Sequence, residues 1–163
     1  MNLDINVILT GLAAPVAVLL VKALLDFSLS HHLVKWLSII PARSFFRDNP
    51  LQLKGRWTQY WGGAGSPNFE QALDRHGHTE IKQFGRYCYA EFVAKNRAYR
   101  MFGQIKGGYL IGEWYDESDK AAYFGVFELR IVSGARLEGK YLGHSARTGA
   151  VQQDDWIWEK VNS

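Results

Sequence analysis

The sequence of 163 residues is poor in cysteine, in proline and in charge of either sign. Its single cysteine, Cys88, excludes an internal disulfide framework and a zinc site built on four cysteines, and it suits a reducing compartment. The 19 basic and 16 acidic residues leave a net charge of only +3, without the basic excess of a dedicated DNA-binding domain. We therefore expect no nucleic acid polymer as a partner.

Glycine and aromatic residues are plentiful but unevenly placed. Aromatic residues make up 14% of the chain, and 15 of the 16 glycines and all 8 tyrosines follow residue 50. This mixture favours a β-rich domain with tight turns and a large aromatic interior. We therefore predict a globular domain over residues 51–163, distinct from what precedes it.

The first part of the chain lacks charge. The 17 residues from Ile5 to Val21 carry none, and the run extends to Leu25 if Lys22 reaches back to the lipid headgroups. Such a helix would be about 31 Å long, close to the ~30 Å hydrocarbon core of a bilayer. We predict a transmembrane anchor over residues 1–28. A cleaved signal peptide is disfavoured because no basic residue precedes the run, and a buried helix of a soluble domain is the other alternative.

Basic residues lie on one side of this predicted anchor only. Between Lys22 and Arg56 there are six basic and two acidic residues, whereas the N-terminal flank has no lysine or arginine. The positive-inside rule then places the N-terminus outside and the rest of the chain in the cytoplasm.

Residues 29–50 are predicted to hold a short amphipathic helix followed by a basic linker. The apolar residues of 29–40 recur at helical spacing, and Trp36 is of the kind that lies at headgroup depth. A second membrane span would carry the following domain across the bilayer, but the two histidines and Lys35 are costly in lipid. The apolar positions are Leu29, Leu33, Trp36, Leu37 and Ile40.

One short motif, glycine followed two residues later by an aromatic residue, recurs after residue 50. Glycine inside a strand usually marks a bend or a close approach, and repeated bends curl a sheet into a barrel. The copies are Leu53-Lys-Gly55-Arg-Trp57, Leu110-Ile-Gly112-Glu-Trp114, Tyr123-Phe-Gly125-Val-Phe127 and Leu137-Glu-Gly139-Lys-Tyr141.

Turn signals between these copies divide the domain into about eight strands. We predict a mainly β fold, a small antiparallel up-and-down β-barrel, preceded by the transmembrane helix and the short amphipathic helix. A β-sandwich is the alternative, and the lack of a long helix argues against βαβ folds. The predicted strands are 51–61, 68–82, 84–95, 97–106, 108–116, 121–132, 135–144 and 151–159.

Alternation along the strands predicts which side chains face inward. Trp57 and Gln59 share a face, as do Trp156 and Trp158, whereas the register of strands 84–95 and 97–106 leaves the direction of Tyr87, Tyr89 and Tyr99 open. An interior with so many polar-tipped aromatic residues predicts a slot for flat rings. The alternative is a barrel filled by its own aromatic side chains.

No enzyme motif withstands inspection. The segment Gly134–Tyr141 nearly matches a phosphate-binding loop but lies in a predicted strand, and His76 with His78 has no evident third metal ligand. The acidic run Asp116–Asp119 is predicted to be a hairpin tip. We therefore predict a chain that is not an enzyme, with neither a catalytic residue nor a metal, and without a cofactor.

An anchor, a basic linker and a glycine–aromatic barrel together resemble the membrane-tethered β-barrel effectors of bacterial cyclic-oligonucleotide anti-phage signalling (CBASS). The resemblance rests on the four motif copies quoted above. It implies a cytoplasmic barrel that binds a cyclic dinucleotide made by a partner nucleotidyltransferase, self-associates into a homo-oligomer and disrupts the bacterial inner membrane. The family's anchor is often a pair of helices, whereas only one span is convincing in this sequence.

A cyclic dinucleotide needs aromatic partners for its bases and cations for its phosphates. An anchored calycin-like barrel for a lipid or other apolar molecule is the alternative function, and a filled structural barrel is a third. The residues expected to bind the ligand are Trp57, Gln59, Tyr99, Trp114, Tyr123 and Tyr141, with Arg97 and Arg147 at the barrel mouth.

Overall fold

The computed structural model describes residues 15–16, 29–39, 50–63, 71–145 and 149–161. It divides into two compact units, Met1–Leu33 and Val34–Ser163. Nearly all of the predicted anchor therefore lies outside the described residues. Within those ranges, no helix is both long enough and apolar enough to cross a membrane.

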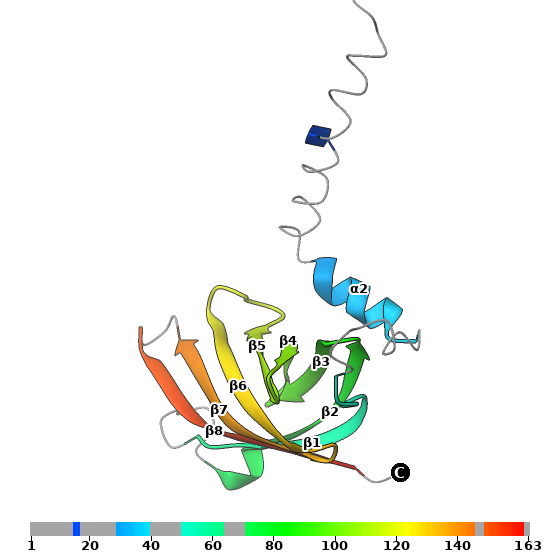
Figure 1. The fold of residues 1–163 in the computed structure, drawn as a ribbon. Coiled ribbons are helices and arrows are strands. Elements are labelled where there is room, and N and C mark those ends of the chain that lie inside the picture. The colour runs from blue at the N-terminus through cyan, green and yellow to red at the C-terminus, as the bar shows by residue number, and fades with distance from the viewer. Residues whose placement is uncertain (1–14, 17–28, 40–49, 64–70, 146–148, 162–163) are drawn as a thin grey trace, which may run out of the picture. The chain divides into compact units, whose positions relative to one another are not determined.

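A short helix occupies the predicted amphipathic segment. Helix α2 (Leu29–Leu37) is drawn in Figure 1, and two apolar side chains at its end are open to solvent. Trp36 is 75% exposed and Ile39, just beyond the helix, is 82% exposed. The helix is confirmed, and its position in a membrane interface stays a prediction.

The last turn of α2 belongs to the second unit and is tied to the barrel by polar contacts. Lys35 Nζ lies 3.1 Å from Glu91 Oε1, and Lys54 Nζ donates to the Ser38 carbonyl over 2.8 Å. Val34 is only 4% exposed. These two polar contacts therefore tie Lys35 and Ser38 to the barrel unit.

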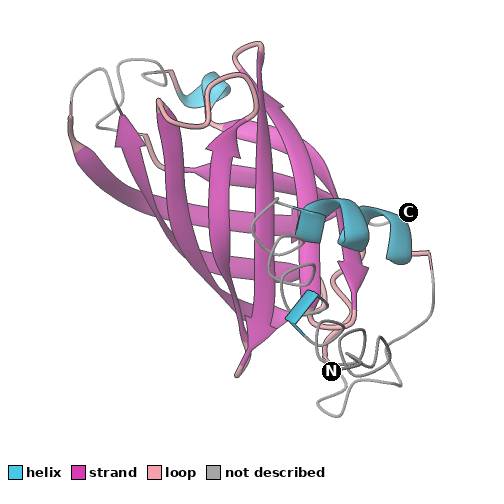
Figure 2. Ribbon diagram, turned by 90° about the horizontal axis from the view of Figure 1, so that it is seen from above, coloured by secondary structure: helices cyan, strands magenta, loops and turns pink. Residues whose placement is uncertain are grey.

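Eight antiparallel strands follow, paired in sequence order and closed by pairing of the last with the first (Figures 1 and 2). This confirms the predicted up-and-down barrel and rules out the sandwich. The strands are β1 (Gly55–Trp61), β2 (His76–Phe84), β3 (Tyr87–Ala94), β4 (Arg97–Lys106), β5 (Tyr109–Asp116), β6 (Tyr123–Ser133), β7 (Arg136–Ser145) and β8 (Val151–Lys160).

The predicted limits of the first two strands were wrong. Strand β1 begins at Gly55, not at 51, because this glycine has a φ of +132° and redirects the chain into the sheet. Strand β2 begins at His76, not at 68, since the 3₁₀ turn η2 (Ala72–Asp74) precedes it. The turn to β3 falls at Gly85, whose φ of +56° suits a tight hairpin.

The glycine–aromatic motif is explained by reciprocal pairing of β5 and β6. Trp114 lies opposite Gly125, and Gly112 lies opposite Phe127. A Cβ on Gly112 would come within 2.8 Å of Phe127 Cζ, and one on Gly125 within 2.6 Å of Trp114 Nε1. Each glycine therefore makes room for the aromatic side chain of the other strand, and this lets the wall bend.

The alternation of inward and outward side chains is confirmed for β1, β5, β6, β7 and β8. For the two strands left open, Phe92 of β3 and Tyr99 and Met101 of β4 belong to the buried core, whereas Tyr87 is exposed on the outer face. Tyr89 occupies an outward-facing position of β3, as Glu91 does, and its hydroxyl donates a hydrogen bond to the Glu91 carboxylate.

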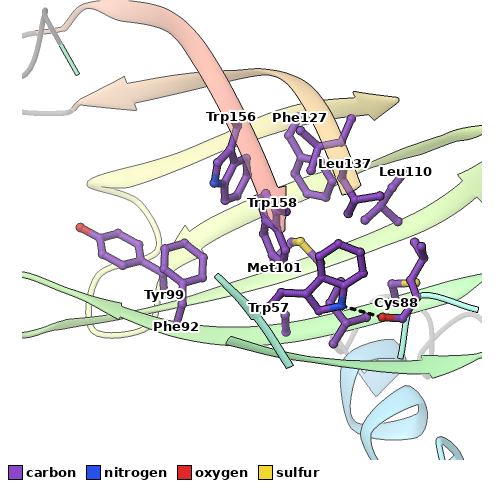
Figure 3. Close-up of a cluster of buried hydrophobic side chains, with 14 of the residues drawn as sticks. Trp57, Cys88, Phe92, Tyr99, Met101, Leu110, Phe127, Leu137, Trp156 and Trp158 are labelled. Carbon is purple, nitrogen blue, oxygen red and sulfur yellow. Dashed lines mark hydrogen bonds between the residues drawn. The ribbon is translucent and has the colours of Figure 1, made fainter. Parts of the chain in front are cut away.

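One end of the barrel, which we term the closed end, is sealed by the segment before β1. The Leu53 amide donates to Gln83 Oε1 and the Trp57 indole donates to the Leu53 carbonyl, both over 2.7 Å. Figure 3 shows this bond beside the packed side chains. The fully buried residues here include Leu53, Trp57, Ile81, Leu110, Leu129, Leu137 and Trp158, each 0% exposed.

Candidate functional site

Five aromatic side chains form an unbroken circuit at the opposite end of the barrel, which we term the loop end. We call them the aromatic cluster: Phe92, Tyr99, Trp114, Tyr141 and Trp156. Their consecutive ring centroids are 5.3, 6.0, 6.1 and 5.8 Å apart, and Trp156 returns to Phe92 at 6.0 Å. These spacings are those of mutually attractive aromatic pairs. The five strands β3, β4, β5, β7 and β8 are thus joined through one set of rings.

The cluster is only partly withdrawn from solvent. Phe92, Tyr99 and Trp156 are between 4% and 9% exposed, whereas Trp114 and Tyr141 are partly exposed. The rings of Trp114 and Tyr141 therefore offer accessible surface beside three buried aromatic side chains.

The indole ring of Trp114 lies against the backbone of two glycines. A Cβ on Gly143 would stand 2.9 Å from Trp114 Cζ2, in addition to the close approach at Gly125, and these two glycines face each other across β6 and β7. The buried Trp114 Nε1 has no hydrogen-bond partner among the described residues. A buried donor without a partner costs about 1–3 kcal/mol, so this group is available to an acceptor brought by a ligand or water.

Gln59 supplies a second unused donor. Its Oε1 accepts a hydrogen bond of 3.1 Å from the Trp156 indole, which joins this side chain to the cluster. The side chain is fully buried, and its Nε2 has no hydrogen-bond partner within the described part of the chain. The interior at this end is therefore less completely hydrogen-bonded than a plain core requires.

A charged pair lies at the rim of the cluster. Arg97 Nη1 is 2.9 Å from Asp116 Oδ2, and the guanidinium carbon is 4.9 Å from the centre of the Tyr123 ring. Asp116 is fully buried, and its Oδ1 also accepts the Ser118 amide over 2.8 Å. The predicted hairpin tip is confirmed for Glu117–Asp119, which lie between β5 and β6, whereas Asp116 is the last residue of β5 and its inward-facing position buries it.

Burial changes the acidity of two tyrosines of the cluster. Burial, followed by the charge of Asp116, raises the pKa of Tyr99 to about 12. Burial, followed by the charge of Asp154, raises the pKa of Tyr141 to about 12. Both hydroxyls are therefore protonated at neutral pH, and that of Tyr141 donates to the Gly62 carbonyl over 3.1 Å.

The structure brings six of the eight predicted binding residues to the loop end: Gln59, Arg97, Tyr99, Trp114, Tyr123 and Tyr141. It does not bring Trp57 there. That indole is fully buried at the closed end, its N–H is used by Leu53, and Lys160 Nζ lies 5.6 Å from its ring. Its inward direction was predicted correctly, but alternation does not give depth along the barrel. Arg147 lies outside the described residues.

Sequence reasoning missed three members of the site: Phe92, Asp116 and Trp156. Phe92 was not predicted because the register of its strand did not show which of its side chains face inward. Trp156 was assigned inward with Trp158, but the sequence did not show that the two belong to opposite ends. Asp116 carried a signal, since it continues the inward positions Leu110, Gly112 and Trp114.

Catalytic and metal chemistry gains no support from the described residues. Within them, no group of three histidine, cysteine or acidic side chains is placed to hold a metal ion. Cys88 is fully buried, and burial raises the pKa of its thiol, so it is not a ready nucleophile.

Comparison with known proteins identifies the fold only. No protein-family model matches the chain, and no curated protein matches it. Among solved structures, the barrel is similar to EF1p2_mFAP2b bound to DFHBI, with a TM-score of 0.51 and 11% identity over 67% of this chain and 94% of that chain. It is also similar to a redesigned beta barrel, with a TM-score of 0.48 and 9% identity over 68% and 92% of the two chains. The likeness to EF1p2_mFAP2b, at 11% identity, is therefore one of fold alone.

Proposed function

We propose that the chain is a membrane-tethered receptor whose barrel binds a ring-containing small molecule at the aromatic cluster. The proposed ligand class is a cyclic dinucleotide, and the proposed response is self-association and disruption of the bacterial inner membrane in anti-phage defence. The observation that carries this proposal is the loop end itself, where partly exposed rings stand beside two buried donors that have no partner among the described residues.

Nucleobases match these groups chemically. A base stacked on an aromatic side chain gains about 1–3 kcal/mol, and base edges carry acceptors for the N–H groups of Trp114 and Gln59 that no other described residue uses. A ligand that accepts from these donors would relieve the cost of leaving them unpaired. A purely aliphatic ligand offers no acceptor to either donor.

The closed end restricts where such a ligand binds. Its interior is filled by side chains that are 0% exposed, including Trp57, Leu129 and Trp158. The proposal therefore assigns the slot for flat rings to the loop end. A barrel of similar fold, EF1p2_mFAP2b, is bound to DFHBI, which supports the capacity of this architecture to hold a small molecule.

The membrane part of the proposal rests on sequence and on α2. The uncharged run from Ile5 to Val21 would span the bilayer, with the N-terminus outside and the barrel in the cytoplasm. The exposed Trp36 and Ile39 suit the headgroup region that would follow such an anchor. Deletion of residues 1–28 should then abolish toxicity in cells that make the ligand, while ligand binding persists.

A second candidate is a receptor for a lipid or another apolar molecule. It is favoured by the carbon-rich floor of the cluster, where Phe92 and Trp156 are in edge contact at 6.0 Å. The two candidates differ in whether the ligand presents flat rings or an aliphatic chain, so one binding panel separates them.

The test is a thermal-shift panel on the full chain in lipid nanodiscs, with cyclic dinucleotides in one arm and fatty acids in the other. Ligand at 100 times its Kd should stabilise the barrel by about 2.7 kcal/mol. Tyr141→Leu should remove the shift, whereas Tyr60→Leu, on the outer face and 45% exposed, should retain it. Stabilisation by fatty acids alone would favour the second candidate, and no shift in either arm would contradict both.

A further inference from the structure

The rim of the aromatic cluster holds a second, chemically different group of side chains. Arg97 and Tyr99 stand two residues apart on the inward face of β4, and Tyr99 pairs directly across from Asp116 of β5. Tyr123 begins the next strand, β6, also with inward parity. A cation, a phenol and a buried carboxylate therefore meet at one corner of the loop end.

The carboxylate of Asp116 is held in place at this corner by several hydrogen bonds. It is fully buried, and the amides of Ser118 and Asp119 donate to Oδ1 over 2.8 and 3.3 Å while Arg97 pairs with Oδ2. A buried carboxylate held by three donors restricts the guanidinium that pairs with it. The contact with the Tyr123 ring, at 4.9 Å, restricts the plane of that guanidinium further.

Arg97 nevertheless keeps much of its hydrogen-bonding capacity. Its side chain is 49% exposed, and a guanidinium has five N–H donors, of which the pair with Asp116 uses one. Among the described residues it forms no second ion pair. A positioned cation with free donors therefore faces the mouth of the barrel.

Tyr99 adds a neutral donor beside that cation. Its side chain is only 7% exposed, and its raised pKa of about 12 keeps the hydroxyl protonated. Figure 3 shows this hydroxyl pointing away from the packed side chains, and no hydrogen bond holds it within the described residues.

We propose that Arg97 and Tyr99 form an anion-binding subsite, with Asp116 as its positioning residue. The subsite takes a phosphate or carboxylate group of a ligand whose ring packs on Trp114 and Tyr141. The placement of the ring rests on the proposed function, whereas the anion subsite stands on the geometry of this corner alone.

On the opposite side of the mouth, a carboxylate lies close to the cluster. Asp154 pairs across from Tyr141 and contributes to raising the pKa of that phenol, and Arg75 partly offsets this effect. The exposed guanidinium of Arg97 can therefore receive an anion at its corner, whereas the carboxylate of Asp154 disfavours one beside Tyr141. This arrangement orients an asymmetric ligand across the cluster.

The first test uses inorganic pyrophosphate and the full chain in lipid nanodiscs, with the ¹⁵N–¹H signal of Arg97 Nε as the readout at low salt. We expect a saturable shift that is weakened at least threefold by Tyr99→Phe, because only the hydroxyl is lost. Arg130→Gln is the matched control, since Arg130 pairs with Glu138 on the exposed outer wall and is 58% exposed. A shift of Arg97 that does not saturate, or that Tyr99→Phe leaves unchanged, would overturn the subsite.

The second test separates this inference from the proposed function. The four ribonucleosides and their 5′-monophosphates are titrated by calorimetry, and the tightest pair is compared across variants. We expect the monophosphate to bind at least tenfold more tightly than its nucleoside, and Arg97→Gln to erase that ratio while Arg130→Gln preserves it. Equal binding of both compounds would refute the anion subsite but retain the ring site. Binding of pyrophosphate without any nucleoside or nucleotide would refute the ring site and retain the anion subsite.

Arg97→Lys is a second variant that keeps the test decisive if Arg97→Gln does not fold. It keeps the charge beside Asp116 but removes the planar fork, so we expect an intermediate ratio of monophosphate to nucleoside affinity. The near-ultraviolet circular dichroism of the aromatic cluster checks that each variant keeps its native packing.

Discussion

The two ends of the barrel use the same residue types for opposite purposes. At the closed end, the indole N–H of Trp57 is satisfied by Leu53 and the surrounding side chains are fully buried. At the loop end, Trp114 Nε1 has no partner among the described residues and two rings of the cluster remain partly exposed. Trp158, in the filled interior, also has an indole Nε1 without a partner among the described residues, so an unpaired donor indicates a binding site only where exposed ring surface accompanies it.

The largest expected effect comes from the wall that both ends share. Gly125→Val should unfold the barrel or cost about 3 kcal/mol or more, because a Cβ there would lie 1.8 Å from the Leu142 carbonyl oxygen. Urea denaturation followed by circular dichroism measures this. Gly134→Ala is the control, since no atom lies within 4 Å of its Cβ position, and an equal loss in both variants would argue against the close packing at Gly125.

A pair of substitutions separates stability from binding at the two ends. Leu129→Ala at the closed end should cost about 2–5 kcal/mol and leave ligand affinity unchanged, because it opens a cavity far from the cluster. Trp114→Leu should cost less stability, about 1–3 kcal/mol from two aromatic contacts, and weaken binding of the stabilising ligand at least tenfold. Denaturation and calorimetry on both proteins check this, and the comparison fails if Leu129→Ala weakens binding more than Trp114→Leu does.

Alkaline pH should act on the loop end through its tyrosines. The pKa values of Tyr99 and Tyr141 are raised to about 12, above the ordinary value of 10.0, so the unfolded state loses these protons first. Their contribution to stability is present below pH 10 and is lost as the pH rises from 10 to 12. Urea midpoints at pH 8, 10 and 11 should fall for the native chain and fall less for the Tyr99→Phe, Tyr141→Phe double variant. Parallel curves for the two proteins would contradict these shifts.

The smallest effect is expected on the outer wall, where α2 meets β3. Burial opposes ionisation of Glu91, but hydrogen bonds from Tyr89 and Lys35 and the charges of Lys35 and Arg100 lower its pKa. Glu91→Gln should therefore cost at most about 1 kcal/mol, as is typical of exposed ion pairs. Thermal unfolding at low and high salt measures this, with Glu138→Gln as the comparison. A loss as large as that of Leu129→Ala would show that this contact holds the barrel together.

Much of the barrel could be predicted because strand alternation and glycine placement are local properties. The glycine–aromatic copies marked β1, β5, β6 and β7, and parity placed Gln59, Trp114 and Tyr141 inside. The start of β2 could not be predicted, because the residues before His76 carry no alternation that separates a strand from the turn η2.

The site was harder to predict because it depends on register. Trp57 and Trp114 occupy equivalent places in their motif copies, yet the stagger of strands around the barrel places them at opposite ends. The partnership of Arg97 with Asp116 joins two strands through a pairing that no single sequence pattern fixes. Depth and cross-strand contacts are properties of the closed sheet and not of its separate strands.

The most direct measurement is a set of intermolecular nuclear Overhauser effects from the ring protons of a stabilising cyclic dinucleotide to the indole protons of the full chain. The six tryptophans include Trp114 and Trp156 at the loop end and Trp57 and Trp158 in the filled interior. We expect contacts to Trp114, and none to Trp57 or Trp158. Contacts to the filled interior, or the absence of contacts to any tryptophan from every cyclic dinucleotide tried, would contradict a receptor that binds rings at its loop end.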